Sequence, residues 1–197
     1  MFDGIFTPEF LQAACSHATP EPEDIIRLHV GTQSVFGLDI RMSFSGQVTI
    51  TYILDGNIQT HVIDESPYET DDCPDEDTYI TIKGNVTLLS LAPPPNTAID
   101  IIDTTETKSL LSLTTNENIE ELRISKYLTY LKVNGTNIKS VSYPANNNAV
   151  STAIANAITG ADANDGIVYT DPDGTYYDTI AQAATAKGWN IITSNEQ

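Results

Sequence analysis

The residues best suited to bind a metal ion are the aspartates of the segment DPDGTYYD, at Asp171, Asp173 and Asp178. Its D-x-D-G opening resembles the start of a calcium loop, because carboxylate oxygens are the ligands that calcium prefers. The distant glutamate that completes an EF-hand loop is absent, and Asp-Gly pairs are also common in plain turns. Calcium binding and ordinary turn formation are therefore the two hypotheses for this segment, and the sequence implies no other cofactor.

The arrangement of nucleophilic and acid–base residues does not favour an enzyme. His17, His29 and His61 lie in separate segments, and none is next to a plausible Ser or Cys nucleophile. No phosphate-binding loop, nucleotide-binding fingerprint or nucleophile elbow is present. Cys15 and Cys73 are far apart, and their spacing leaves open whether they pair. We therefore expect a non-enzymatic protein.

The charge of the chain excludes one large class of partner. Nine Lys and Arg residues stand against 27 Asp and Glu, giving a net charge of −18 in 197 residues. Such a field repels a phosphate backbone, so no nucleic-acid partner is expected. No apolar run approaches the roughly 20 residues of a membrane span, and the N-terminus lacks the features of a signal peptide. We expect the protein to stay in the compartment where it is made.

Residues 1–24 read as a helical arm followed by a linker. Thr7-Pro8-Glu9 is a typical helix start, and the segment ATPEPED ends the helix after about His17. The arm is either the first packing element of the fold or a peptide that docks on a partner, and we favour docking. It carries five large apolar side chains: Phe2, Ile5, Phe6, Phe10 and Leu11.

Residues 25–84 read as antiparallel β-structure. The runs IIRLHV, FGLDIRMSF, QVTITYIL and IQTHVI alternate apolar and polar residues in the way of half-buried strands. Ser45-Gly46 and Asp55-Gly56 lie between runs, where tight hairpins favour positive φ. The acidic segment 64–77 is expected to be a solvated loop.

Residues 85–145 contain three segments of similar pattern, at 86–103, 108–125 and 127–144. We expect each to place one inward apolar pair before a corner, at Leu89/Leu91, Leu111/Leu113 and Leu131/Val133, and a second pair after it. The spacing is that of leucine-rich repeats, in which stacked turns bury a shared core. This alignment predicts buried columns containing Leu111 and, separately, Leu122 and Val141. It also predicts an outward apolar row that could form an interface: Leu88, Leu110 and Tyr130.

Residues 146–197 are expected to form a mixed α/β cap that closes the repeats. The segment NNNAVSTAIANAITG is alanine-rich and helical from about Asn148. The remainder predicts a strand, a turn, a helix through Ile180 and Ala184, a C-terminal cap at Gly188 and a last strand.

The segment TYITIKGNVTLLSL and the closing phrase from Ala184 to Ile191 together carry a resemblance. The chain resembles proteins of Bacteroidetes and their phages that join a polycystic-kidney-disease (PKD)-like β-sandwich to leucine-rich repeats. That family has an acidic W-G-D-G hairpin, of which TITYILDGNIQTHVI keeps only Asp55-Gly56. The fold class implied is mainly β with an α/β cap: a PKD/immunoglobulin-like β-sandwich followed by a short leucine-rich-repeat solenoid.

The resemblance implies a structural role in protein–protein interaction. We expect a bacteriophage virion component, such as an auxiliary or decoration capsid protein or a head fibre, assembled in the host cytoplasm beside capsid or other virion proteins. The alternatives are a bacterial cell-surface adhesin and a glycan-binding module. The sequence indicates neither the oligomeric state nor the identity of the partner.

Overall fold

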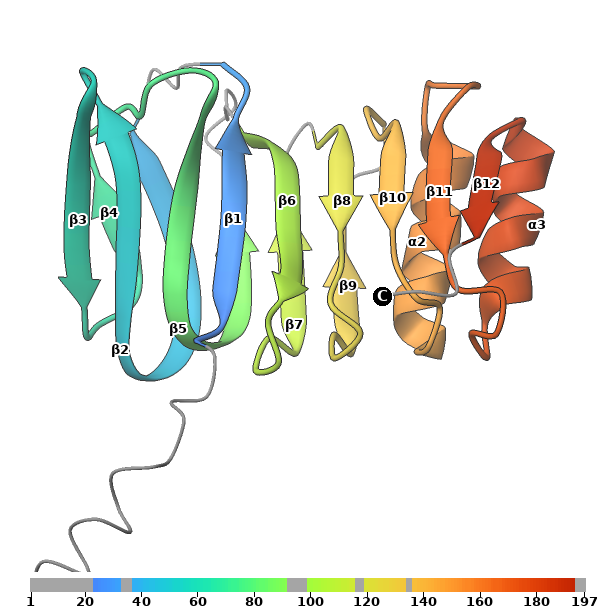
Figure 1. The fold of residues 1–197 in the computed structure, drawn as a ribbon, viewed down its shortest axis with the longest axis horizontal. Helices are drawn as coiled ribbons and strands as arrows, with labels where there is room; N and C mark the ends of the chain where they lie inside the picture. Colours follow the sequence, from blue (N-terminus) through green and yellow to red (C-terminus); the bar gives the residue numbers. More distant parts are fainter. Residues whose placement is uncertain (1–22, 33–36, 92–98, 116–118, 134–135, 194–197) are drawn as a thin grey trace, which may run out of the picture.

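The computed structural model describes residues 23–32, 37–91, 99–115, 119–133 and 136–193. Within them, twelve strands belong to one hydrogen-bonded sheet and are accompanied by two helices (Figure 1). The protein is mainly β, as the sequence predicted. The first five strands are β1 (Ile25–Val30), β2 (Leu38–Leu54), β3 (Asn57–Ile63), β4 (Tyr68–Thr70) and β5 (Thr78–Leu91).

The long strands β2 and β5 each pass from one layer of the molecule to the other. They pair antiparallel along both halves, with a register shift between Ser45 and Thr49. The N-terminal half of β5 also pairs with β1 in the front layer, whereas its C-terminal half continues in the back layer. β5 bends at Gly84, which has φ 131° and whose Cβ, if present, would lie 2.8 Å from the Gln47 carbonyl oxygen. The expected boundary between residues 84 and 85 therefore falls inside a continuous strand.

One of the two predicted hairpin turns is present. β2 and β3 meet at Asp55-Gly56, where both residues have positive φ, 50° and 72°. The hairpin expected at Ser45-Gly46 is wrong, because β2 continues through these residues and Gly46 takes its positive φ at the register shift instead. A glycine inside a strand supports such a bulge as readily as a turn.

After β5 the chain winds through successive turns that stack in parallel. The strands of this part are β6 (Ile99–Glu106), β7 (Ser112–Thr115), β8 (Glu121–Arg123), β9 (Tyr130–Lys132) and β10 (Ser140–Ser142). β5, β7 and β9 form one parallel ladder at the back, and β6, β8 and β10 form another at the front. Each turn therefore contributes one strand to each layer.

The C-terminal segment continues this stacking with helices in the back layer. Its elements are α2 (Asn148–Gly160), β11 (Ile167–Thr170), α3 (Tyr177–Lys187) and β12 (Asn190–Thr193). β11 and β12 extend the front ladder in parallel, while α2 and α3 lie behind it (Figure 1). α3 ends at Gly188, whose φ of 80° makes it a left-handed C-cap. The predicted order of helix, strand, helix and strand is confirmed. None of the described helices is long and apolar enough to cross a membrane.

The core lies between the two layers and is built from columns of residues in register. In the front ladder the buried column includes Leu122 and Val141, as predicted. In the back ladder the buried column is Leu89, Leu113 and Leu131. The prediction that Leu111 belongs to this column is wrong, since 47% of Leu111 is exposed. The core is mostly aliphatic, and Tyr52 and Tyr143 are among its largest fully buried side chains.

Candidate functional site

The outer surface of the back layer follows one six-residue order in each turn. Residues 86–91, 110–115 and 128–133 place their side chains inward, outward, outward, inward, outward and inward. This order is the L-x-x-L-x-L phrase, because its first, fourth and sixth residues face the core. Consecutive outward residues at the second and third positions occur where β7 and β9 begin, and in β5 they occur at a register shift, since Leu88 pairs with Ser43 but Val86 with Phe44.

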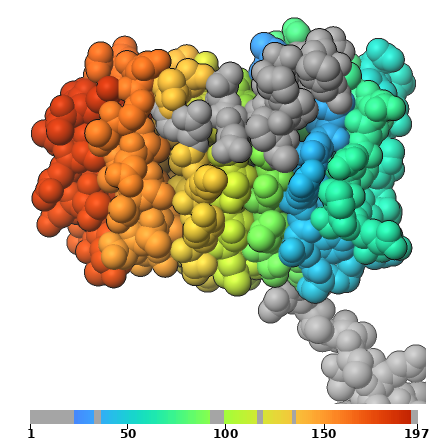
Figure 2. Space-filling model, turned by 180° about the vertical axis from the view of Figure 1, so that it is seen from behind, coloured from blue at the N-terminus to red at the C-terminus, as the bar shows by residue number. Residues whose placement is uncertain are grey.

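An exposed apolar cluster results on this face. It consists of Leu88 on β5, Tyr130 on β9 and two corner residues, Leu111 and Tyr127, each at least 38% exposed. Leu88 and Tyr130 flank Ser112 in register, and the Tyr130 amide donates to the Leu111 carbonyl oxygen at 3.0 Å. We call these four residues the back-face patch. Figure 2 shows this side of the molecule, with β7 and β9 near its middle in yellow-green and yellow.

The predicted outward row of Leu88, Leu110 and Tyr130 needs one correction. Leu110 is completely buried, and Ser112 holds the register position between Leu88 and Tyr130. The exposed leucine of this turn is Leu111, at the corner before β7. The cause is a tetrapeptide, Leu-Leu-Ser-Leu, that occurs twice, at 88–91 and 110–113. The first copy begins at an outward position of its turn and the second at an inward position, so the first two leucines of the copies face in opposite directions.

The charges around the back-face patch differ from those of the rest of the chain. The segments 85–91, 108–115 and 126–133 contain no acidic residue, although the chain has 27. They contain three lysines, Lys108, Lys126 and Lys132. The Lys126 ammonium lies 5.4 Å from the centre of the Tyr127 ring, within cation–π range. An apolar surface with a basic rim is therefore embedded in a strongly acidic protein.

The other half of the predicted interaction surface cannot be placed. The arm residues Phe2, Ile5, Phe6, Phe10 and Leu11 lie outside the described residues, as does Cys15. The structure therefore places only the repeat half of that prediction, on the outer side of β5, the β7 corner and β9.

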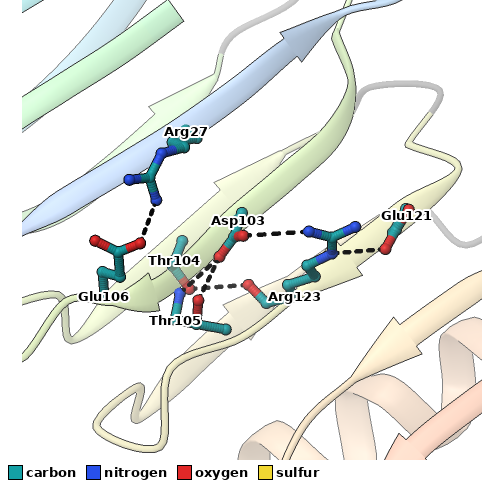
Figure 3. A network of polar contacts seen from close by, with 7 residues as sticks. All are labelled: Arg27, Asp103, Thr104, Thr105, Glu106, Glu121 and Arg123. Atoms are coloured by element: carbon teal, nitrogen blue, oxygen red, sulfur yellow. Dashed lines mark hydrogen bonds and ion pairs between the residues drawn. The ribbon is translucent and has the colours of Figure 1, made fainter. Parts of the chain in front are cut away.

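The front layer carries a polar network on its outer side (Figure 3). The Arg123 guanidinium contacts Glu121 at 2.6 Å and Asp103 at 3.5 Å. The amide and hydroxyl of Thr105 both donate to the Asp103 carboxylate, at 3.0 Å and 2.6 Å. A neighbouring ion pair joins Arg27 and Glu106 at 2.6 Å. The hydrogen bond and the charge of Glu121 raise the pKa of Arg123, which stays a cation.

This network borders a hollow of about 790 Å³ across β6, β8, β10 and β11. Its lining is polar except for one aromatic ring, and comprises Asp103, Thr105, Glu121, Arg123, Ser140, Ser142 and Tyr169. This hollow was not predicted from the sequence. It could have been predicted from the parallel register of the front ladder, but that register can be read only when the turns are aligned correctly.

A second polar cluster lies where β2, β3 and β4 meet. The buried Tyr52 hydroxyl contacts His61 Nε2 at 3.0 Å and the Tyr68 hydroxyl at 3.4 Å, and it donates to Asp72. Burial and the hydrogen bond to Asp72 hold the pKa of Tyr52 far above its usual value. Tyr52 therefore stays protonated and serves as a hydrogen-bond donor rather than as a nucleophile.

The structure also places the histidines predicted to lie in strands and the aspartates predicted to bind calcium or form a turn. His29 and His61 are strand residues, as expected, and His29 Nδ1 is 2.7 Å from Asp100 Oδ1. Asp171 accepts from the Asp173 amide at 2.9 Å in a turn, and Asp178 lies in the first turn of α3. No group of three His, Cys, Asp or Glu residues in the described part of the chain is arranged to hold a metal ion.

Comparisons with known proteins add no family. No protein-family description, curated protein or solved structure matches the chain.

Proposed function

We propose that the protein is a non-enzymatic structural and interaction protein, and specifically a bacteriophage virion component that decorates the capsid or forms part of a head fibre. The observation that carries the interaction role is the back-face patch. Its four exposed apolar side chains lie together on a rigid sheet, and such patches are typical of protein contact surfaces. The virion assignment rests on the sequence resemblance to repeat proteins of Bacteroidetes phages.

The proposed fold assignment is a PKD/immunoglobulin-like sandwich followed by a short leucine-rich-repeat solenoid. In support, β2 and β5 cross between two layers, and the later turns stack in parallel with an L-x-x-L-x-L order of burial. The back-face patch lies on the repeats, and the arm of residues 1–24 is the second proposed contact. A bacterial cell-surface adhesin is the alternative role for the same surfaces.

The partner surface should be acidic around an apolar centre. The back-face patch has lysines at its rim and no acid in its three segments, whereas the whole chain carries −18. Opposite charge around an apolar contact steers association and excludes wrong partners, while the apolar centre supplies most of the affinity.

Co-sedimentation tests this function. Particles from the cells that make the protein are separated on a density gradient, and the protein is detected by antibody in the particle fraction. Leu111→Asp and Tyr130→Asp should each move it to the soluble fraction, because a charge replaces about 1.5–3 kcal/mol of apolar contact. Ile58→Asp is the matched control, since Ile58 is exposed on β3, which pairs with the front-layer half of β2 and not with the strands of the patch.

Deleting residues 1–18 separates the two contacts. If the arm carries attachment, the truncated protein is soluble, keeps its melting temperature and no longer joins particles. If the patch carries attachment, truncation leaves co-sedimentation intact. A protein absent from particles in its unaltered form would contradict the virion assignment, and attachment that survives truncation and both patch substitutions would contradict the proposed surfaces.

A further inference from the structure

The hollow of the front layer is a trough whose shape follows from strand register. On β10, Ser140 and Ser142 point outward between longer side chains of the neighbouring strands. Ser142 is paired with Arg123 of β8 on one side and with Tyr169 of β11 on the other. Short side chains between long ones leave a floor of hydroxyl groups between two walls.

The width of the trough suits a single flat ring. β8 and β11 are separated by two strand spacings, or about 9.5 Å between backbones. The Tyr169 ring forms one wall and is 37% exposed, so part of an aromatic surface is open to a ligand. The other wall is the Arg123 guanidinium together with Glu121 and Asp103.

The polar groups of this wall are held in place before any ligand binds. Arg123 bridges Glu121 and Asp103, and Thr105 donates twice to the same Asp103 oxygen. Fixed donors and acceptors lose little entropy on binding, which favours recognition of hydroxyl groups in a defined orientation. The two serine hydroxyls of the floor can each both donate and accept.

The charge balance of the trough selects among ligand classes. Two carboxylates face one guanidinium, so an anionic ligand meets net negative charge. Arg123 occupies the carboxylates that a metal ion would need, and no three-ligand metal group occurs in the described chain. A neutral ligand with many hydroxyl groups and one apolar face matches both the polar wall and the aromatic wall.

We propose that this trough binds a neutral saccharide, with the apolar face of a sugar ring against Tyr169 and its hydroxyl groups on Ser140, Ser142 and the Asp103–Arg123–Glu121 network. The site lies in the front layer, opposite the back-face patch, and stands independently of the proposed virion function. Saccharide binding through the front layer would leave the back layer available for a protein partner.

The test is binding of the full-length protein to a printed array of neutral, sialylated and sulfated oligosaccharides. The neutral glycan retained most strongly is then titrated in solution by calorimetry. We expect retention of neutral glycans. Tyr169→Ala should weaken the affinity at least about tenfold by removing the aromatic wall, and Ser142→Leu should do the same by filling the trough.

Two further variants distinguish loss of the Tyr169 ring from a general loss of folding. Tyr169→Phe keeps the ring and should retain binding, and Tyr130→Ala on the back layer is the matched control that should bind like the unaltered protein. Melting temperatures show that each variant is folded. The proposal is overturned if no neutral glycan is retained, if sialylated or sulfated glycans bind in preference, or if Tyr169→Ala and Ser142→Leu bind undiminished.

Discussion

Asp24 is the residue that fixes the first corner of the stacked turns. Its carboxylate is almost fully buried and accepts from the Lys108 amide at 3.0 Å, from the Ser109 amide at 2.6 Å and from the Ser109 hydroxyl at 2.5 Å. The same Ser109 hydroxyl oxygen lies 3.0 Å from the Val86 carbonyl oxygen and so can share its proton with it, which ties this corner to the preceding turn. One side chain far away in sequence thereby sets where the second turn begins.

Replacing Asp24 should lower stability through these lost acceptors. Asp24→Ala removes the acceptor of the partly buried Lys108 and Ser109 amides, at a cost of about 1–3 kcal/mol in the free energy of unfolding. Asp24→Asn keeps one acceptor oxygen and should lose less. Urea unfolding monitored by circular dichroism measures both variants. Equal stability of Asp24→Ala and the unaltered protein would show that the corner does not depend on this carboxylate.

Tyr143 makes stability depend on pH in the alkaline range. Burial raises its pKa to about 12, whereas an unfolded tyrosine titrates near 10. Between these values the unfolded chain releases a proton that the folded chain keeps, so the free energy of unfolding falls as pH rises. The fall amounts to at most about 1.4 kcal/mol per pH unit for this residue. Tyr143→Phe should therefore flatten the decline.

The matched control for the alkaline decline is Tyr130→Phe. Tyr130→Phe removes a half-exposed tyrosine and keeps Tyr143, so its slope between pH 10 and 12 should be steeper than that of Tyr143→Phe. Tyr52, whose pKa is also raised by burial, contributes to the slope in both variants. Equal slopes for Tyr143→Phe and Tyr130→Phe would contradict the assignment to Tyr143.

At the scale of the element, the six-residue unit of the back layer decides which leucines are structural. Leu110 and Leu113 occupy inward positions of the unit, whereas Leu111 occupies an outward one. A parallel ladder repeats this choice in every turn, because residues in register share one direction. The unit therefore predicts opposite responses from neighbouring leucines.

The pair Leu113→Ala and Leu111→Ala tests this unit. Leu113 is completely buried, so its truncation should cost about 2–5 kcal/mol of unfolding free energy. Leu111 is 47% exposed, so its truncation should cost less than about 1 kcal/mol. Chemical denaturation gives both values. A larger loss for Leu111→Ala than for Leu113→Ala would reverse the register described here.

Elements with strong local signals were predictable from the sequence, and register was not. The helices after Asn147 and Tyr176 and the Asp55-Gly56 turn follow from caps, periodicity and turn chemistry. The outward row was misaligned because the repeated Leu-Leu-Ser-Leu suggests one register, while Asp24, 84 residues away from Lys108, imposes another. Long-range contacts of this kind leave no local pattern. The trough was missed for the same reason, since it exists only once four strands are in register.

Across the whole molecule, acidic residues are unevenly distributed over the surface. The strands at the front carry Asp100, Asp103, Glu106 and Glu121, whereas the repeat segments at the back carry lysines and no acid. This distribution would favour an acidic partner at the repeat segments of the back layer, as proposed above. The chain as a whole has an excess of negative charge, because nine basic residues cannot neutralise 27 acidic ones.

Added salt should consequently stabilise the fold. Two opposing effects are screened: repulsion among the excess acids, which favours unfolding, and ion pairs such as Arg27–Glu106, which favour folding. Exposed pairs contribute only about 0–1 kcal/mol each, whereas repulsion acts over the whole surface of a chain of charge −18. The melting temperature should therefore rise as sodium chloride increases from about 0.01 to 0.5 M, where the Debye length shortens from about 30 Å to a few ångströms.

Sodium chloride rather than sulfate is the salt to use, because sulfate also strengthens apolar burial. Arg27→Gln should show the same rise from a similar starting point, and a melting temperature that falls with salt would show that ion pairs, rather than net charge, govern the stability of this molecule.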